Sequence, residues 1–116
     1  MARYIDDYRT VWFHGEVEFL KWLQATYPKD FEKYRKERFN KVIKEESPDI
    51  GNPEVMSFTA IEQHFRDNEK LKTSGLYSVY SIYDIAEDFY DNYCSKNVTA
   101  IITECNNQFI LILIGE

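Results

Sequence analysis

Apolar residues change their spacing close to the start of the chain. The segment from Tyr8 to Phe13 is rich in β-branched and aromatic residues, which favours a strand. From Glu16 onward, apolar residues recur every three or four positions, which predicts a helix. We expect this helix to end before Pro28, because the residue that precedes a proline disfavours helical angles. The first part of the chain therefore predicts a strand followed by a helix.

Two more helical patterns follow. The segment Lys29–Glu46 carries one narrow apolar stripe on an otherwise charged helix. After a Pro- and Gly-containing loop at 47–53, a third helix is expected to start at Thr59, where Thr59 and Glu62 match a capping box, and to fade near Lys72. The stripe of the second helix consists of Phe31, Tyr34, Arg38, Phe39, Val42 and Ile43.

The next segments contain a weaker and a stronger pattern. Leu76–Tyr80 is interpreted as a short strand or an extended connector. Ser81 and Asp84 then form a second capping pair, which begins a helix that ends near Ser95. Its buried face should consist of Ile82, Ile85, Ala86, Phe89 and Tyr93.

The C-terminal segment predicts a β-hairpin. Val98–Glu104 and Phe109–Ile114 are two strand-like runs, and Asn106-Asn107 suits a two-residue turn because asparagine tolerates positive φ. In that register Ile102 faces Leu111 and Ala100 faces Leu113. The last strand is apolar at every position, so we expect it to be central and covered on both faces.

These elements define the expected fold. We predict one α+β domain over residues 1–116, with about four helices packed on a small, mainly antiparallel three-stranded sheet that ends in the hairpin. A chain of 116 residues can bury a core without a metal or a disulfide. Its longest apolar run is far too short to span a bilayer, and its N-terminus lacks the apolar core of a signal peptide. We therefore expect a soluble cytoplasmic protein with no membrane partner.

Charge argues against nucleic acid as a partner. The chain carries 14 Lys and Arg against 20 Asp and Glu, a net charge of −6, whereas nonspecific nucleic-acid or anionic-membrane binding needs an excess of cations. Residues 29–46 are the basic part, but acidic residues are interspersed among their cations, which favours a self-solvating helix. An alternative is that this helix pairs with an acidic helix of a second copy in a homodimer.

Motifs of catalysis and cofactor binding are missing from the sequence. The four glycines are isolated, which excludes a glycine-rich phosphate loop, and neither Cys-x-x-Cys nor His-Glu-x-x-His occurs. His14, Glu16 and Glu18 offer nitrogen and oxygen ligands, but such residues are common at a strand-to-helix junction. We expect no catalytic residue, no metal and no cofactor.

The helix that follows Ser81 carries the candidate site. Four carboxylates occupy positions i, i+3, i+4 and i+7 and so share one face, opposite the apolar stripe. Carboxylates in a row on one helix do not face each other across a cleft, so glycosidase-like chemistry is disfavoured. Two interpretations stay open: an ordinary solvated helix face, or a surface for a basic protein partner in which the tyrosines supply contact area. The expected partner-binding residues are Asp84, Glu87, Asp88, Asp91, Tyr80, Tyr83 and Tyr90.

In size, acidity and tyrosine content the chain resembles small antagonist proteins of bacteria and phages, including immunity proteins that neutralise nuclease toxins. That resemblance rests on broad character and carries over no individual residue. It implies a non-enzymatic inhibitor, immunity- or antitoxin-like, whose acidic face blocks a basic nuclease-type toxin.

Two other functions stay open at this point. The first is a small enzyme or ligand-binding domain whose site is assembled from scattered residues such as His14, His64, Cys94 and the tyrosines. The second is a structural or scaffold protein that acts as a homo-oligomer.

Overall fold

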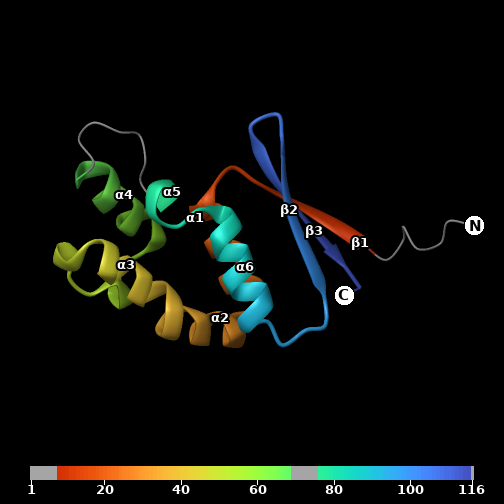
Figure 1. Ribbon diagram of the computed structural model, residues 1–116, viewed down its shortest axis with the longest axis horizontal. Helices are drawn as coiled ribbons and strands as arrows, with labels where there is room; N and C mark the ends of the chain where they lie inside the picture. Colours follow the sequence, from red (N-terminus) through yellow and green to blue (C-terminus); the bar gives the residue numbers. More distant parts are fainter. Residues whose placement is uncertain (1–7, 69–75, 116) are drawn as a thin grey trace, which may run out of the picture.

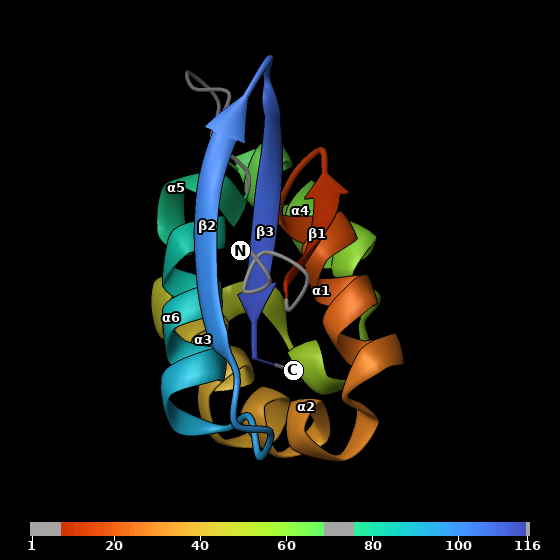
Figure 2. The same ribbon diagram turned by 90° about the vertical axis from the view of Figure 1, so that its right-hand side faces the viewer.

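The chain forms a three-stranded antiparallel sheet with a layer of helices on one side. The structure is a computed structural model and describes residues 8–68 and 76–115. Strands β1 (Tyr8–Phe13), β2 (Thr99–Cys105) and β3 (Gln108–Ile114) pair in the order β1-β3-β2. Figure 1 shows the sheet beside the helices, and Figure 2 shows the sheet in front with the helices behind it. The predicted α+β class and its C-terminal hairpin are confirmed.

The hairpin has the register that the sequence predicted. Ile102 lies opposite Leu111 and Ala100 lies opposite Leu113. The turn residues Asn106 and Asn107 have φ values of 52° and 65°, the left-handed conformation that a primed two-residue turn requires. These two asparagines fix the turn, and the turn fixes the register of the hairpin. A slip of one residue would move the side chains of a strand to the opposite face of the sheet.

The position of β3 is also confirmed, but its covering is not. β1 pairs with β3 on one side and β2 on the other, so β3 is the central strand. Leu111 and Leu113 point toward the helices and are fully buried. Ile110 and Ile112 point the opposite way and stay partly accessible, because the helices lie on one face of the sheet (Figure 2). The expectation that both faces are covered is therefore wrong for the part of the chain that the structure describes.

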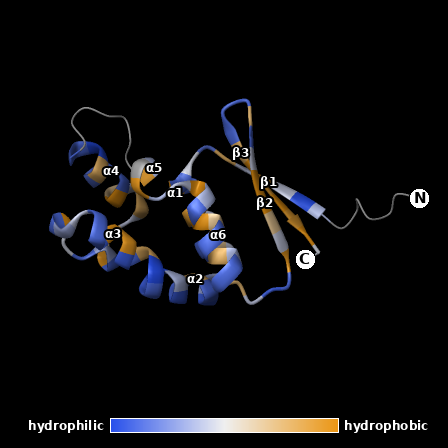
Figure 3. Ribbon diagram, viewed as in Figure 1, coloured by the Kyte–Doolittle hydropathy of each residue, from blue (hydrophilic) through white to orange (hydrophobic). Residues whose placement is uncertain are grey.

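Among the described residues, the helical layer contains four longer helical segments and one short turn of helix. They are α1 (Glu16–Thr26), a continuous helix made of α2 (Pro28–Tyr34), the π-helical segment η2 (Arg35–Phe39) and α3 (Asn40–Glu46), then α4 (Phe58–Asn68), the short α5 (Leu76–Val79) and α6 (Ile82–Asn92). Two 3₁₀ turns, η3 (Pro48–Ile50) and η4 (Pro53–Val55), lie in the loop before α4. Figure 3 shows hydrophobic residues along the sheet and hydrophilic ones along the outside of α2.

The π-helical segment explains why the second helix departs from the predicted stripe. Tyr34 and Phe39 are both fully buried although they are five positions apart. A regular α-helix would direct residue 38 to the core, whereas one π turn, with the Asn40 N–H bonded to the Arg35 carbonyl, advances Phe39 to that place. Arg38 is consequently half exposed, and its assignment to the apolar stripe is wrong.

Two other local predictions need correction. Leu76–Tyr80 was expected to be extended, but Leu76–Val79 is helical, and the Tyr80 N–H bonds to the Leu76 carbonyl. Leu76 and Tyr80 both face the core, as residues one helical turn apart do. The cap of α4 is Ser57, whose hydroxyl accepts from the Ala60 N–H, rather than Thr59. The predicted end of that helix near Lys72 lies outside the described residues.

Within residues 8–68 and 76–115, none of the helices has both the length and the apolar character needed to cross a bilayer.

Candidate functional site

A groove separates α6 from the edge strand β2. Its volume is about 460 Å³. From α6 it is lined by Tyr83, Asp84, Ala86, Glu87, Tyr90 and Asp91, and from the other side by Val98, Thr99, Ala100 and Ile102. We call this feature the α6–β2 groove. Five of the seven residues that the sequence singled out therefore come together in one concave surface.

Local sequence fixes the orientation of α6 in this groove. The Ser81 hydroxyl accepts from the Asp84 N–H and donates to the Asp84 carboxylate at 3.1 Å, which caps the first turn. Ile82, Ile85 and Phe89 are fully buried, as predicted. Because those side chains point into the core, the carboxylates of Asp84, Glu87 and Asp91 are exposed along the groove.

The two tyrosines of the groove are anchored differently. Tyr83 packs edge-on against Phe109 at 5.9 Å between ring centroids, and desolvation together with the nearby Glu104 carboxylate raises the pKa of its hydroxyl. The Tyr90 hydroxyl donates to the Tyr27 hydroxyl at 3.1 Å. Tyr83 is the more exposed of the two, with 44% of its surface accessible.

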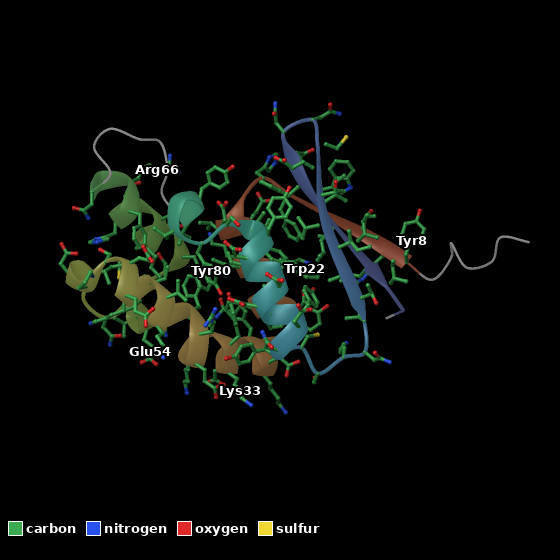
Figure 4. The ribbon with its side chains drawn as sticks, viewed as in Figure 1. Tyr8, Trp22, Lys33, Glu54, Arg66 and Tyr80 are labelled. Atoms are coloured by element: carbon green, nitrogen blue, oxygen red, sulfur yellow. The ribbon has the colours of Figure 1, made fainter. Side chains whose placement is uncertain are left out.

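Asp88 and Tyr80 belong to a separate cluster inside the molecule. Tyr80 is buried between α6 and the α2–α3 helix (Figure 4), and its hydroxyl donates to the Asp88 carboxylate. The fully buried Tyr34 donates to the Tyr80 hydroxyl at 2.8 Å, and Arg38 Nε donates to Asp88 at 3.0 Å. Burial raises the pKa of both tyrosines above its usual range. These contacts hold α6 against the second helix. The α6–β2 groove therefore contains only the other five predicted residues.

The basic and acidic helices thus contact each other within one chain. Arg38 pairs with Asp88, and the Tyr93 hydroxyl lies 3.4 Å from a Glu37 carboxylate oxygen. Arg35 is turned toward the loop that precedes α4, where its guanidinium donates to the Pro53 and Met56 carbonyls. The basic helix uses these two arginines for internal contacts.

β2 forms one wall of the groove and is an edge strand of the sheet. In an antiparallel pair, alternate residues direct their N–H and C=O groups away from the partner strand. Cys105 and Gln108 close the two-residue turn as a hydrogen-bonded pair, so the backbone groups of Ala100, Ile102 and Glu104 point to the free edge. No further strand pairs with that edge among the residues that the structure describes.

The sequence did not reveal this wall of the groove. Val98, Ala100 and Ile102 read as ordinary core-facing hairpin residues, and only the packing of α6 beside β2 brings them to the carboxylates. The packing of α6 beside β2 is a tertiary contact between two separate elements, so no local sequence pattern indicates it.

The two histidines lie in separate polar clusters. His14 lies at the end of β1, where its ring is 3.5 Å from the Gln108 amide, and His64 lies on α4. His64 contacts the Ser47 hydroxyl at 2.9 Å, and that hydroxyl donates to Asp49 at 2.9 Å. The Asn68 side-chain amide lies 3.1 Å from the same His64 nitrogen, so His64 takes part in a local polar cluster with Ser47, Asp49 and Asn68.

In the described ranges, no three His, Cys, Asp or Glu side chains lie close enough to hold a metal ion.

No protein-family model matches the chain, and neither the curated proteins nor the solved structures yield a significant match.

Proposed function

We propose that this chain is a non-enzymatic protein-binding inhibitor whose α6–β2 groove receives a basic segment of another protein. The observation that carries the proposal is the composition of the groove. Asp84, Glu87 and Asp91 line it with two tyrosines, and none of the described residues that line it is lysine or arginine. A groove of this kind favours a cationic occupant.

The chemistry of the lining suits a protein surface. Carboxylates speed the encounter with a basic partner and exclude acidic ones, including nucleic acid. Tyr83 and Tyr90 supply flat, partly apolar contact area, the kind of residue that dominates binding energy at interfaces. A nuclease active site is rich in cations because it holds phosphates, so an immunity- or antitoxin-like role follows as the specific form of the proposal.

The free edge of β2 supports a polypeptide as the occupant. An extended partner segment in the groove pairs with the outward backbone groups of Ala100, Ile102 and Glu104, while its side chains reach the carboxylates of α6. Backbone pairing supplies affinity, and the carboxylates supply the preference for Lys and Arg.

The proposal is tested by inhibition in cells. The gene next to this one in the source genome is expressed alone and together with this chain, and growth is measured. We expect the neighbour to arrest growth, the wild-type chain to restore it, and the triple variant D84N/E87Q/D91N to restore it poorly. The control E32Q/E45Q/E46Q removes three exposed carboxylates from the second helix, so it has the same net charge and should protect like the wild type.

The same variants are compared in vitro with the purified neighbour product. Association should slow about tenfold or more for the groove variant at low salt, and its salt dependence should weaken. Equal protection and equal association rates for the two triple variants would overturn the groove as the site. A harmless neighbour that does not bind the chain would overturn the inhibitor role.

A further inference from the structure

On the face of the sheet that points away from the helices, nine side chains form three complete rows across the three strands, and Gln108 and Cys105 add a two-strand row at the turn of the hairpin. Pairing across the strands aligns Trp12, Ile110 and Thr103 in one row, Thr10, Ile112 and Ile101 in the next, and Tyr8, Ile114 and Thr99 in the third. We call this surface the open face. It is uncovered by helices in Figure 2, and Figure 4 labels Tyr8 at the start of β1.

The open face is uncharged in a strongly charged protein. None of the nine residues in its complete rows is ionisable near neutral pH, whereas 29% of the chain is Asp, Glu, Lys or Arg. Four of its large apolar side chains are substantially accessible: Tyr8 at 50%, Trp12 at 47%, Ile101 at 44% and Ile114 at 40%. A flat sheet surface with this composition is the usual inner face of a two-sheet sandwich.

Its size matches the lower limit for a specific interface. Strands of seven residues and three strands side by side give a face of about 20 by 14 Å. With protruding aromatic side chains, such a face presents on the order of 500 Å² of accessible surface. Two of them packed together would bury about 1,000 Å² in total, which is what a specific but weak interface needs.

We infer that the open face is the interface of a homodimer in which two copies pack sheet against sheet. A two-fold axis that runs between the two sheets, parallel to β3, places each row opposite the same row of the second copy. It also places β1 of one copy over β2 of the other. Trp12 then lies over Thr103 of the second copy, Tyr8 over Thr99, and Thr10 over Ile101. In each complete row a large side chain of one copy faces a small one of the other, and the central isoleucines face each other.

Charge restricts where a second copy can dock. Two chains that each carry a net charge of −6 repel each other, and an interface between them is easiest to form where neither contributes a charge. The helices lie on the opposite side of the sheet, so dimerisation leaves the carboxylates of α6 accessible. The inference therefore stands without the proposed inhibitor function.

The experiment measures mass in solution. We expect the wild-type chain at about 300 µM to show twice its 13.9 kDa mass by light scattering and to dissociate on dilution, as weak interfaces do. Ile101→Lys places a charge opposite Thr10 of the second copy and should raise the dimer dissociation constant at least about tenfold. Val55→Lys makes the same charge change at an exposed apolar residue outside the sheet and should leave it unchanged. Circular dichroism confirms that both variants fold.

A cross-link tests the orientation of the two copies. In the background C94A/C105S, a mixture of T10C chains and I101C chains should be joined by a bismaleimide that spans the ~10 Å between two packed sheets. Neither variant alone should cross-link efficiently. A monomeric wild type at the highest concentration, or a dimer that survives Ile101→Lys, overturns the inference. A monomer that binds a hydrophobic dye would instead assign the open face to a different protein.

Discussion

The hydroxyl group of Tyr80 donates a hydrogen bond to the same carboxylate oxygen of Asp88 that accepts from Arg38. Tyr80 comes directly before the cap of α6, and Asp88 lies two turns into that helix. The bond therefore fixes the angle at which α6 leaves α5, and with it the position of the carboxylates along the groove. A buried polar cluster of this kind stabilises one arrangement only while all its members are paired.

Removal of the Tyr80 hydroxyl should destabilise the fold. In Tyr80→Phe the fully buried hydroxyl of Tyr34 loses its hydrogen-bond acceptor, which should lower the free energy of unfolding by about 1–3 kcal/mol. Urea denaturation measures this change. Tyr83→Phe removes an exposed hydroxyl from the same helix and should stay within about 0.5 kcal/mol of the wild type. Equal stability of the two variants would show that the cluster does not hold α6.

The central strand should be sensitive to truncation on its helix-facing side. Leu111→Ala opens a cavity among fully buried side chains and should lower the free energy of unfolding by about 2–5 kcal/mol, most of the stability of a small domain. Val55→Ala, at a residue with 81% of its surface exposed, should change it by less than about 0.5 kcal/mol. A melting temperature within a couple of degrees of the wild type for Leu111→Ala would contradict the packing of β3.

A buried carboxylate at the start of α1 should make stability depend on pH. Burial raises the pKa of Glu16 above 4.5, and the nearby Glu62 raises it further, although the Glu16 backbone N–H lowers it. The folded protein therefore binds this proton more tightly than the unfolded chain does, so stability falls as pH rises from 4.5 through the raised pKa. Glu16→Gln should be more stable than the wild type at pH 7 and should match it at pH 4.

Denaturation of Glu16→Gln at the two pH values checks this expectation. Glu18→Gln is the matched control, because Glu18 is exposed and accepts the His14 N–H at 3.0 Å, so its neutralisation should bring no gain at pH 7. A stability difference between Glu16→Gln and the wild type that is the same at pH 4 and pH 7 would contradict the assignment.

The acidic row of α6 should weaken its own helix. Glu87 and Asp91 are four positions apart, so their like charges repel, and E87Q/D91N should raise the free energy of unfolding by about 0.2–0.5 kcal/mol. High salt should remove most of that gain, because both carboxylates are exposed and screened. Thermal unfolding at low and at high salt measures both effects, and a gain that survives high salt would point to a cause other than repulsion.

Sequence patterns were sufficient for the sheet and most of the helices. The Asn106-Asn107 turn set the register of the hairpin, and the wholly apolar β3 indicated a central strand. The failures have a common origin. Arg38 left the core stripe because tertiary packing favoured one π turn, and the turn of helix at Leu76–Val79 places the Tyr80 hydroxyl in contact with Tyr34 and Asp88. Local sequence propensity gives no information about tertiary contacts of this kind.

The candidate site was predictable on one side only. The period of α6 placed Asp84, Glu87 and Asp91 on one face, and the structure agrees. The separation of Asp88 from that face depends on Tyr80 and Arg38, which reach it from other elements. The opposite wall and the open edge of β2 follow from strand order, which becomes visible only when the whole sheet is assembled.

The sheet joins distant parts of the chain, and this has a consequence for the order of assembly. His14 and Gln108, which lie 94 positions apart, meet where β1 ends and β3 begins. During synthesis the helices leave the ribosome before β3 does, so they cannot yet pack on a central strand. The hairpin forms quickly because its loop is short, but β1 must close a far longer loop to join it. Until then the nascent chain exposes the apolar side of its helices, and during this interval it depends most on chaperones.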